Sequence, residues 1–516
     1  MKGRMTSRYD SAIGAYIIVA LFHAVVLGVL PAEAQTAPEG PQQPPYSADR
    51  SIAIVGGLLI DATGASPRHD QTVRIEGGRI VEIGPMEQIE IPAGAHVIDA
   101  SGMTIMPGLI DFNQHIVLNP LVSTPDMDFT LEEFKERWER NWAQMERQAY
   151  TYLMQGVTSF RQTPGPADLE LDLIRRIEAG EVAGPRIFLG GALWMSEPHF
   201  QAHLSSYGQT DPAAIEFIRH QFEYNVIRDT TELDPNGWGV EGPDFNFWKL
   251  YMWEETFDGE NDFTDEELRF IIDRAHALGI SIDVHAGGHN IGLRRMLEYD
   301  IDTLEHPFYG HEIIDWDVIN GYVDKGVIVG TLLQVMIGRA ERAADPHRFN
   351  QTLYTMSLEP WEHRLLMRYR DKMLWNQRHP DEPGFTIYPE DSDERGRSYN
   401  EQMRQRETSI ENMRRFIMAG AKFWMGTDTG AWMALRQENP QAREMMWMVR
   451  LGMDPLDAIQ AATRNGAEGL GMLDDLGTIE IGKLADVIVV AGNPLEDMLG
   501  AMSSVYAVIK AGIRYK

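Results

Sequence analysis

The stretch SIDVHAGGHNIGLRRMLEYDIDTLEH, residues 281–306, decides the fold class. It contains two short apolar runs that each end in a histidine, and an amphipathic segment separates them. This order is typical of a βαβ unit, in which a helix joins two parallel strands. The stretch therefore predicts an α/β protein with a parallel sheet.

The same alternation of apolar runs and amphipathic segments extends over residues 107–467. We expect strands at residues 106–112, 157–161, 186–190, 245–251, 281–285, 302–306, 327–333 and 422–427. Eight strands with helices between them predict a closed (β/α)8 barrel of the TIM type. An open doubly wound sheet is the alternative, but no glycine-rich phosphate loop follows an early strand.

Three helix starts carry their own sequence signals. Thr130 with Glu133, and Thr264 with Glu267, have the spacing of a capping box. Asp454 precedes a proline, which is favoured in the first turn of a helix. These signals place helices between the predicted strands.

The two ends of the chain, outside the barrel, have a different sequence pattern, with short strand-like runs. Residues 51–61 and 71–85 read as hairpin strands, and residues 484–490 and 505–515 are also strand-like. Strands that lack other partners would most economically pair with each other. We therefore predict a small composite β-sandwich domain made of residues 50–106 and 468–516.

The first residues resemble a targeting segment. Lys2, Arg4 and Arg8 precede an apolar stretch at residues 12–30, and small residues at A-x-A spacing follow at 32–34. We expect a signal peptide over residues 1–34, export to the periplasm or the medium, and a flexible linker over residues 35–49. The alternative is an uncleaved membrane anchor, because the apolar stretch is long for a signal peptide.

Charge and composition restrict the partners. The formal net charge is −31, which disfavours nucleic acid and anionic membranes as partners and favours a small-molecule substrate. The chain has no cysteine, so it forms no disulfide.

The long, charged segment at residues 338–406 is either a lid, an oligomer contact in a homo-oligomer or a solvated helical excursion.

Five polar side chains fall at or near the ends of the predicted strands, where barrel enzymes carry their catalytic residues. They are His115, Lys249, His285, His306 and Asp428. Taken singly, each has an ordinary structural explanation, such as a hydrogen-bonded histidine or a turn aspartate. Their joint placement at one rim instead indicates a metal site, because imidazole and carboxylate suit Zn²⁺ and similar divalent ions.

Lys249 lies in a predicted strand between Trp248 and Leu250. Since successive side chains of a strand point to opposite faces, the lysine faces away from these two apolar neighbours. We expect the lysine to point into the barrel.

The chain resembles the amidohydrolase superfamily, and within it the imidazolonepropionase-like and prolidase-like branch. The motifs that carry the resemblance occur in the family's order: MPGLID at 106–111 followed by His115, FWKLY at 247–251, DVHA at 283–286, LEH at 304–306, MGTD at 425–428 and LGTIEIGKLAD at 476–486 followed by GNP at 492–494. The resemblance covers almost everything from residue 51 to residue 516.

The resemblance implies a metal-dependent hydrolase of carbon–nitrogen bonds, acting on an amide, a cyclic amide or a dipeptide through a metal-activated water. His285 and His306 would hold the more exposed metal, with His115 as a further ligand. Lys249 would react with carbon dioxide and bind the metal as a carbamate. Asp428 would be both a ligand and the proton shuttle.

One position departs from the family pattern, which has His-x-His after the first strand. This chain has Asn113 followed by Gln114 and His115, and an amide oxygen is a poorer ligand for zinc-like ions than imidazole. We therefore expect a weakened inner metal position and one ion per chain, and a non-catalytic binding protein remains the alternative. Tyr251 and His199 are candidates for substrate contact.

Overall fold

The computed structural model describes residues 51–116, 145–163, 167–196, 245–252, 263–310, 312–338, 360–385, 398–430 and 439–516, with shorter pieces at 212–213, 215, 224–227, 341, 345 and 395–396. The expected signal peptide, the linker, the capping box at Thr130 and the candidate His199 lie outside these residues. Within the described part, no helix combines the length and apolar character needed to cross a membrane.

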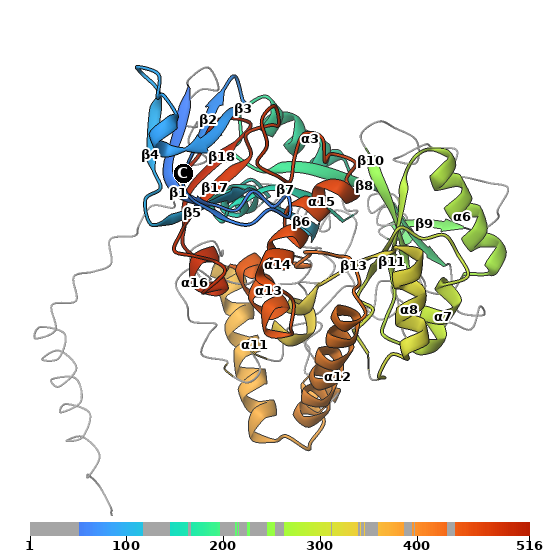
Figure 1. Cartoon of the computed structure of the whole chain (residues 1–516). Coiled ribbons are helices and arrows are strands. Elements are labelled where there is room, and N and C mark those ends of the chain that lie inside the picture. Colours follow the sequence, from blue (N-terminus) through green and yellow to red (C-terminus); the bar gives the residue numbers. More distant parts are fainter. Residues whose placement is uncertain are drawn as a thin grey trace, which may run out of the picture. The chain divides into compact units, whose positions relative to one another are not determined.

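The barrel is a parallel sheet in the order β16-β13-β12-β11-β10-β8-β7-β6 (Figure 1). Its strands are β6 (Leu109–Gln114), β7 (Val157–Gln162), β8 (Arg186–Ser196), β10 (Phe245–Tyr251), β11 (Ser281–His285), β12 (Thr303–Glu305), β13 (Ile328–Gly330) and β16 (Phe423–Trp424). A further strand, β9 (Tyr224–Ile227), pairs with β8 and was not predicted.

The two outer strands of this sheet meet and close the barrel. The Phe112 N–H donates to the Met425 carbonyl at 2.8 Å, and the Asp428 N–H donates to the Asn113 carbonyl at 2.9 Å. A parallel bridge between Gln114 and Thr429 continues this contact. The predicted eight-stranded (β/α)8 barrel is confirmed.

Helices follow the strands along the chain. They are α3 (Ala167–Glu178), α6 (Asp265–Ala277), α7 (Asn290–Met296), α8 (Trp316–Lys325), α11 (Pro360–Arg378), α12 (Tyr399–Met418), α13 (Pro440–Arg450), α14 (Pro455–Ala461) and α15 (Arg464–Gly469). The capping box at Thr264 is formed, and the Asp454 side chain accepts the Leu456 N–H at 2.8 Å. Figure 1 shows α11, which lies in the charged segment, and α12, which begins in it, extending away from both sheets.

The first predicted strand is in fact two. Residues 103–107 form β5 (Met103–Pro107) in the terminal sheet, and β6 begins at Leu109 in the barrel. Gly108 lies between them, and a Cβ atom there would lie 2.2 Å from Thr158 Oγ1. The glycine therefore permits the close approach at which the chain passes from one sheet to the other.

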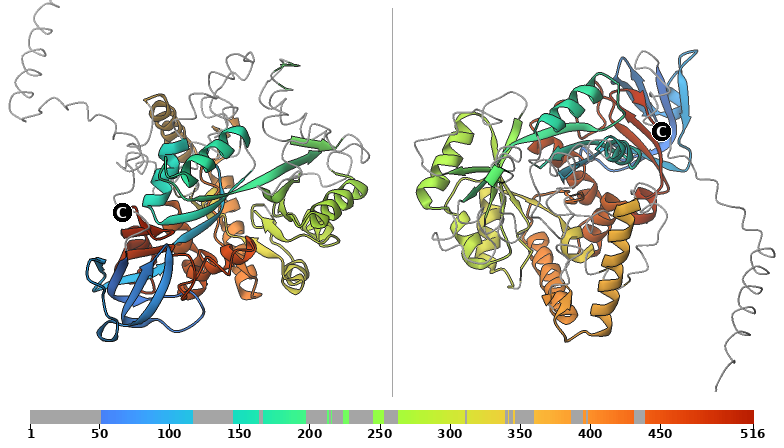
Figure 2. Two further views of the ribbon diagram at one scale, coloured as in Figure 1. Left: turned by 90° about the horizontal axis from the view of Figure 1, so that it is seen from above. Right: turned by 180° about the vertical axis from the view of Figure 1, so that it is seen from behind.

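The terminal sheet joins strands from both ends of the chain in the order β19-β18-β17-β5-β1-β2-β3, and β4 pairs with β1. The strands are β1 (Ile52–Leu59), β2 (Arg68–Glu76), β3 (Arg79–Pro85), β4 (His96–Asp99), β17 (Val487–Ala491), β18 (Val505–Lys510) and β19 (Ile513–Arg514). The antiparallel pair β17·β5 joins the two ends. Figure 2 shows these blue and red strands on one side and the yellow-green helices α6, α7 and α8 on the other.

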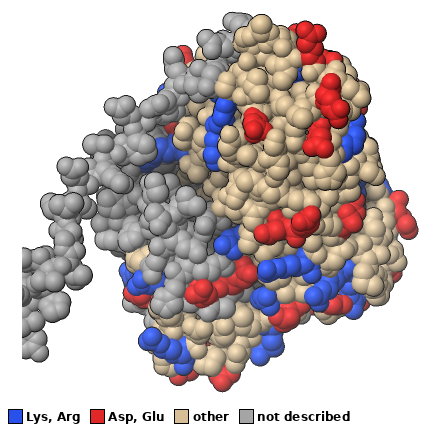
Figure 3. Space-filling model, turned by 60° about the vertical axis from the view of Figure 1, so that its left-hand side comes forward, with Lys and Arg blue, Asp and Glu red and all other residues tan. Residues whose placement is uncertain are grey.

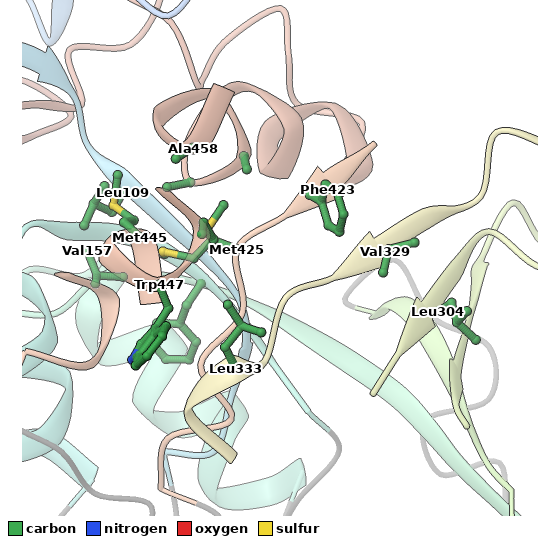
Figure 4. Close-up of a cluster of buried hydrophobic side chains, with 14 of the residues drawn as sticks. Leu109, Val157, Leu304, Val329, Leu333, Phe423, Met425, Met445, Trp447 and Ala458 are labelled. Carbon is green, nitrogen blue, oxygen red and sulfur yellow. The ribbon is translucent and has the colours of Figure 1, made fainter. Parts of the chain in front are cut away.

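One large apolar cluster fills the space between the barrel strands and their helices. Figure 4 shows Leu109 and Met425 packed with Met445 of α13 and Ala458 of α14. Trp248 belongs to this cluster and is fully buried. On the face drawn in Figure 3, acidic and basic side chains of the described residues lie interspersed.

Candidate active site

Four of the predicted site residues meet at the carboxyl ends of the barrel strands. His285 ends β11, His306 follows β12, His115 follows β6 and Asp428 follows β16. Asp428 Oδ1 lies 2.9 Å from His115 Nε2, and its Oδ2 lies 4.0 Å from His306 Nε2. The ring centroids of His285 and His306 are 4.3 Å apart. Strands far apart in the sequence thus bring three imidazoles and one carboxylate together.

Two of these residues have a strained backbone. His306 has a φ of 59° and Asp428 a φ of 54°, in the left-handed region that side chains with a Cβ rarely adopt. Such strain costs free energy and persists where the surrounding structure enforces it, most often at functional sites. The turns that aim His306 and Asp428 inward are consistent with a functional rim.

Burial and neighbouring charges shift the pKa values of Asp428 and His285, and these shifts determine which groups are charged at neutral pH. Burial alone would raise the pKa of Asp428, but the hydrogen bond from His115 and the nearby positive charges lower it to about 2. Burial and the neighbouring Lys249 lower the pKa of His285 to about 3. The site at neutral pH therefore contains a carboxylate and a neutral imidazole, the forms in which both side chains bind metal ions.

Lys249 points into the barrel, as strand alternation predicts. Its side chain is 4% exposed, and its Nζ donates to Glu305. Trp248, its neighbour in β10, packs on the outer side against Trp194 with ring centroids 5.2 Å apart. The amine is thus held inside the barrel by an ion pair with a residue that the sequence did not single out.

Glu305 also pairs with a second cation. Arg161 Nη2 lies 3.0 Å from Glu305 Oε1 and 2.5 Å from Asp283 Oδ2. The Arg161 guanidinium is fully buried between aromatic rings, 4.0 Å from the centroid of Phe112 and 3.9 Å from that of Phe247. Arg161 and Lys249 therefore pair with Asp283 and Glu305 in one buried group of two cations and two carboxylates.

Asn113 occupies the position of the missing family histidine and belongs to this polar network. Its Nδ2 donates to Glu305 Oε2 at 2.9 Å, and its Oδ1 accepts the Thr163 hydroxyl at 2.5 Å. The amide is therefore oriented by Glu305 at the end of β12 and by Thr163 directly after β7. Its oxygen is occupied by a hydroxyl donor.

Asp111 forms hydrogen bonds with residues next to His115 and next to Asp428, and so connects the two segments that carry them. Its carboxylate accepts from the Thr427 N–H at 3.1 Å, from the Thr427 hydroxyl at 2.7 Å and from Gln441 at 2.9 Å, and it also accepts from Gln114. Thr427 directly precedes Asp428, and Gln114 directly precedes His115. One buried carboxylate thereby fixes both neighbours of the His115–Asp428 pair.

The structure describes one of the two candidates for substrate contact, Tyr251, but not the other, His199. Tyr251 ends β10, and its ring stacks on His285 with centroids 4.2 Å apart and an interplanar angle of 22°. It therefore lies beside the candidate ligands. His199 is outside the described residues.

The donor set fits a zinc-like ion in its chemistry. Three imidazoles and a carboxylate are the ligand types that such ions prefer, and all four converge on one rim. In the part of the chain that the structure describes, no three His, Cys, Asp or Glu side chains stand as a ready metal-binding group. Asp428 is hydrogen-bonded to His115 instead, so an ion held by both side chains would replace this hydrogen bond.

Sequence reasoning missed the inner partners Arg161 and Thr163, and it quoted Asp283 and Glu305 only as parts of motifs. A signal for Arg161 and Asp283 was present, because each is a charged residue inside a predicted strand. Such a charge is buried only when it is paired. Nothing in the local sequence indicated which charges would pair.

Comparison with known proteins agrees with this geometry. The model of the amidohydrolase family matches residues 104–514. The chain belongs to the amidohydrolase family. The resemblance and the barrel fold expected from the sequence are both confirmed.

Individual relatives are distant. A 5-methylthioadenosine/S-adenosylhomocysteine deaminase of Symbiobacterium thermophilum is 32% identical over 130 residues, which cover 23% of this chain and only 29% of the deaminase. Ochratoxinase of Aspergillus niger is 23% identical over 476 residues, covering 86% of this chain and 82% of the relative.

Two solved structures share the fold. A Xaa-Pro dipeptidase with bound methionine is 21% identical, with a TM-score of 0.63 and coverage of 90% of this chain and 100% of the dipeptidase. Molinate hydrolase is 24% identical, with a TM-score of 0.63 and coverage of 91% and 95%.

Proposed function

We propose that this protein is a divalent-metal-dependent hydrolase that cleaves the amide bond of a small molecule. The observation that carries the proposal is Asp428, whose two oxygens face His115 and His306 at the carboxyl ends of the barrel strands. A carboxylate between two imidazoles can serve both as a ligand and as a base. The relatives named ochratoxinase and Xaa-Pro dipeptidase support the class of reaction.

We propose that His285, His306, Asp428 and His115 supply protein ligands for a single Zn²⁺ ion. A divalent ion bound there would polarise the carbonyl of the substrate and lower the pKa of a water molecule. Asp428 accepts a proton from the attacking water and then delivers it to the leaving nitrogen. His115 Nε2 is hydrogen-bonded to Oδ1 of this carboxylate in the structure and would exchange this hydrogen bond for the ion.

Lys249 is proposed as a further ligand in the form of a carbamate. Carboxylation would turn the Lys249 cation into an anion and break its ion pair with Glu305. Glu305 would keep its contacts with Arg161 at 3.0 Å and the Asn113 amide at 2.9 Å, and a divalent ion bound by the carbamate would replace the positive charge that Lys249 loses. The barrel interior can therefore accommodate the modification.

Tyr251 is proposed as a substrate contact, because its stacking on His285 places an aromatic ring at the edge of the ligand set. A ring at that place favours substrates with an apolar or cyclic group beside the scissile amide. N-acyl amino acids, Xaa-Pro dipeptides and cyclic amides meet this description.

The test uses the purified full chain loaded with Zn²⁺, with these three substrate classes as a panel. We expect turnover of at least one class, loss of turnover on chelation and recovery when the metal is returned. Asp428→Asn should abolish most of the activity, whereas Asp474→Asn, at an exposed position, should not. One bound ion without turnover of any member of the panel would favour the non-catalytic alternative.

A further inference from the structure

A cavity lies far from the candidate ligands in the fold. It has a volume of about 270 Å³ and is formed by the C-terminal half of α3, the start of β8 and the β18–β19 hairpin. Arg186, the first residue of β8, lines it, so the cavity lies at the amino end of the barrel strands. The candidate active site lies at their carboxyl ends. The two sites are therefore separate.

Most of the cavity wall is apolar. The side chains that form it include Ile174 and Ile177 of α3, Ile187 of β8, Ile513 of β19 and Tyr515. A cavity with such a wall, large enough for a few carbon atoms and open to solvent, is suited to the apolar part of a small molecule.

Lys510 supplies a buried positive charge at this cavity. The residue is 8% exposed, and its Nζ donates to the Gly184 carbonyl at 2.5 Å and lies 5.7 Å from the ring centroid of Tyr515. Among the described residues, no carboxylate lies within ion-pair distance of this Nζ. An ammonium has three N–H donors, and the carbonyl uses one of them.

The other charged groups nearby do not neutralise Lys510 directly. Arg186 Nη1 lies 2.8 Å from Asp486 Oδ2, and Asp486 Oδ1 accepts the Ala511 N–H at 2.8 Å. Asp486 is thus engaged elsewhere, and Glu178 at the cavity rim is exposed. Burial lowers the pKa of Lys510 to about 8, although the negative charges of Asp486 and Glu178 raise it in part.

We propose that this cavity is a binding site for a small monocarboxylate with an apolar tail, whose carboxylate pairs with Lys510 and whose tail packs against the isoleucines. A carboxylate would use the remaining N–H donors of the ammonium and offset its burial. An amine of the same length would bring a second positive charge to Lys510. An alcohol would provide a hydrogen bond without the charge.

The experiment uses the full chain and hexanoate as the probe, with hexylamine and hexan-1-ol as ligands of matched length, and measures binding by calorimetry. We expect saturable binding of hexanoate, weaker binding of the alcohol and none of the amine. Lys510→Met should weaken hexanoate binding by at least about tenfold, the loss of one charge-assisted hydrogen bond. Equal binding of all three ligands would overturn the proposal.

Two control variants keep the test decisive. Lys325 also donates its Nζ to a backbone carbonyl, that of Tyr299 at 2.9 Å, but lies at the end of α8, so Lys325→Met should bind hexanoate normally. Ile174→Trp fills the cavity from a half-buried position, retains Lys510 and should lose binding even if Lys510→Met does not fold. Retained binding in Ile174→Trp would contradict the site.

A carboxylate could also bind to a metal in the active site, and the same measurement separates the two places. Chelated protein and Asp428→Asn should bind hexanoate as the unmodified protein does. Binding that disappears in these two samples and survives in Lys510→Met would assign the carboxylate to the active site and overturn the proposal.

Discussion

Asn113 Nδ2 lies 2.9 Å from Glu305 Oε2, and this hydrogen bond joins the position of a missing family ligand to the residue that holds Lys249. The Asn113 amide forms hydrogen bonds with Glu305 and Thr163 at the position where the family histidine would bind a metal. The relationship gives the single-metal proposal a structural basis, since the amide oxygen already accepts the Thr163 hydroxyl.

The first prediction concerns the number of ions. The unmodified protein should hold close to one tightly bound divalent ion per chain, because Asn113 is a poor ligand for zinc-like ions. Asn113→His supplies an imidazole and should raise the content toward two. Elemental analysis of both proteins measures this, and two stoichiometric ions in the unmodified protein would contradict it.

The second prediction concerns Asp428. Asp428→Asn keeps the shape of the side chain and removes the base, so kcat should fall by roughly two to four orders of magnitude. The thermal midpoint should change little, since the residue lies at the end of a strand rather than in the apolar core. Steady-state kinetics at matched metal content decides the matter, and full activity would remove Asp428 from the mechanism.

The third prediction concerns Lys249. Lys249→Ala should lose metal and activity together, because the carbamate proposed as a ligand cannot form. Added acetate or propionate should restore part of both by occupying the space of the carbamate. A structure determined at neutral pH with zinc present is the direct measurement. An unmodified amine still paired with Glu305 beside a filled metal site would show that the carbamate assignment is wrong.

The barrel and its rim were predictable from sequence because they depend on local patterns. Apolar runs that end in His285 and His306 mark both the strand and the edge at which the side chain emerges. The place of the first strand was less predictable, since Gly108 separates two strands that belong to different sheets. The end of one strand and the start of the next become visible only in the structure, where Gly108 lies too close to Thr158 for any residue with a Cβ atom.

The polar interior of the barrel was not predictable for a different reason. Arg161 meets Asp283 and Glu305 across strands that are 122 and 144 residues away in the sequence. Pairings over such separations depend on strand order and register, which a single sequence does not give. The same holds for Lys510, whose significance depends on a cavity formed by three separate segments.

The fourth prediction follows from that interior. Arg161→Met would leave Asp283 as a buried carboxylate without its cation, and breaking a buried ion pair in this way costs about 3–5 kcal/mol. The free energy of unfolding, measured with urea, should fall by this amount. Arg79→Met is the matched control, because both side chains of its pair with Asp475 are exposed, at 49% and 39%, and the pair should contribute under about 1 kcal/mol. Equal effects of the two substitutions would contradict the prediction.

The fifth prediction concerns Glu170, a fully buried residue of α3. Its Oε1 accepts from Gln162 at 2.7 Å, and its Oε2 has no hydrogen-bond partner among the described residues. Burial raises its pKa from 4.5 to about 8, and the hydrogen bond from Gln162 lowers it by less. Between these two pH values the native state keeps a proton that the unfolded chain releases. The free energy of unfolding should therefore decrease as pH rises through this range.

Glu170→Gln resembles the protonated side chain and does not titrate, so it removes this part of the pH dependence. Relative to the unmodified protein, the variant should gain stability as pH rises from about 5 to about 8, by at most roughly 1.4 kcal/mol per pH unit. Urea unfolding at several pH values measures the difference, and Glu87→Gln at an exposed position should run parallel to the unmodified protein. A constant difference across the range would mean that Glu170 is ionised in the native state, and its buried Oε2 would then require a donor.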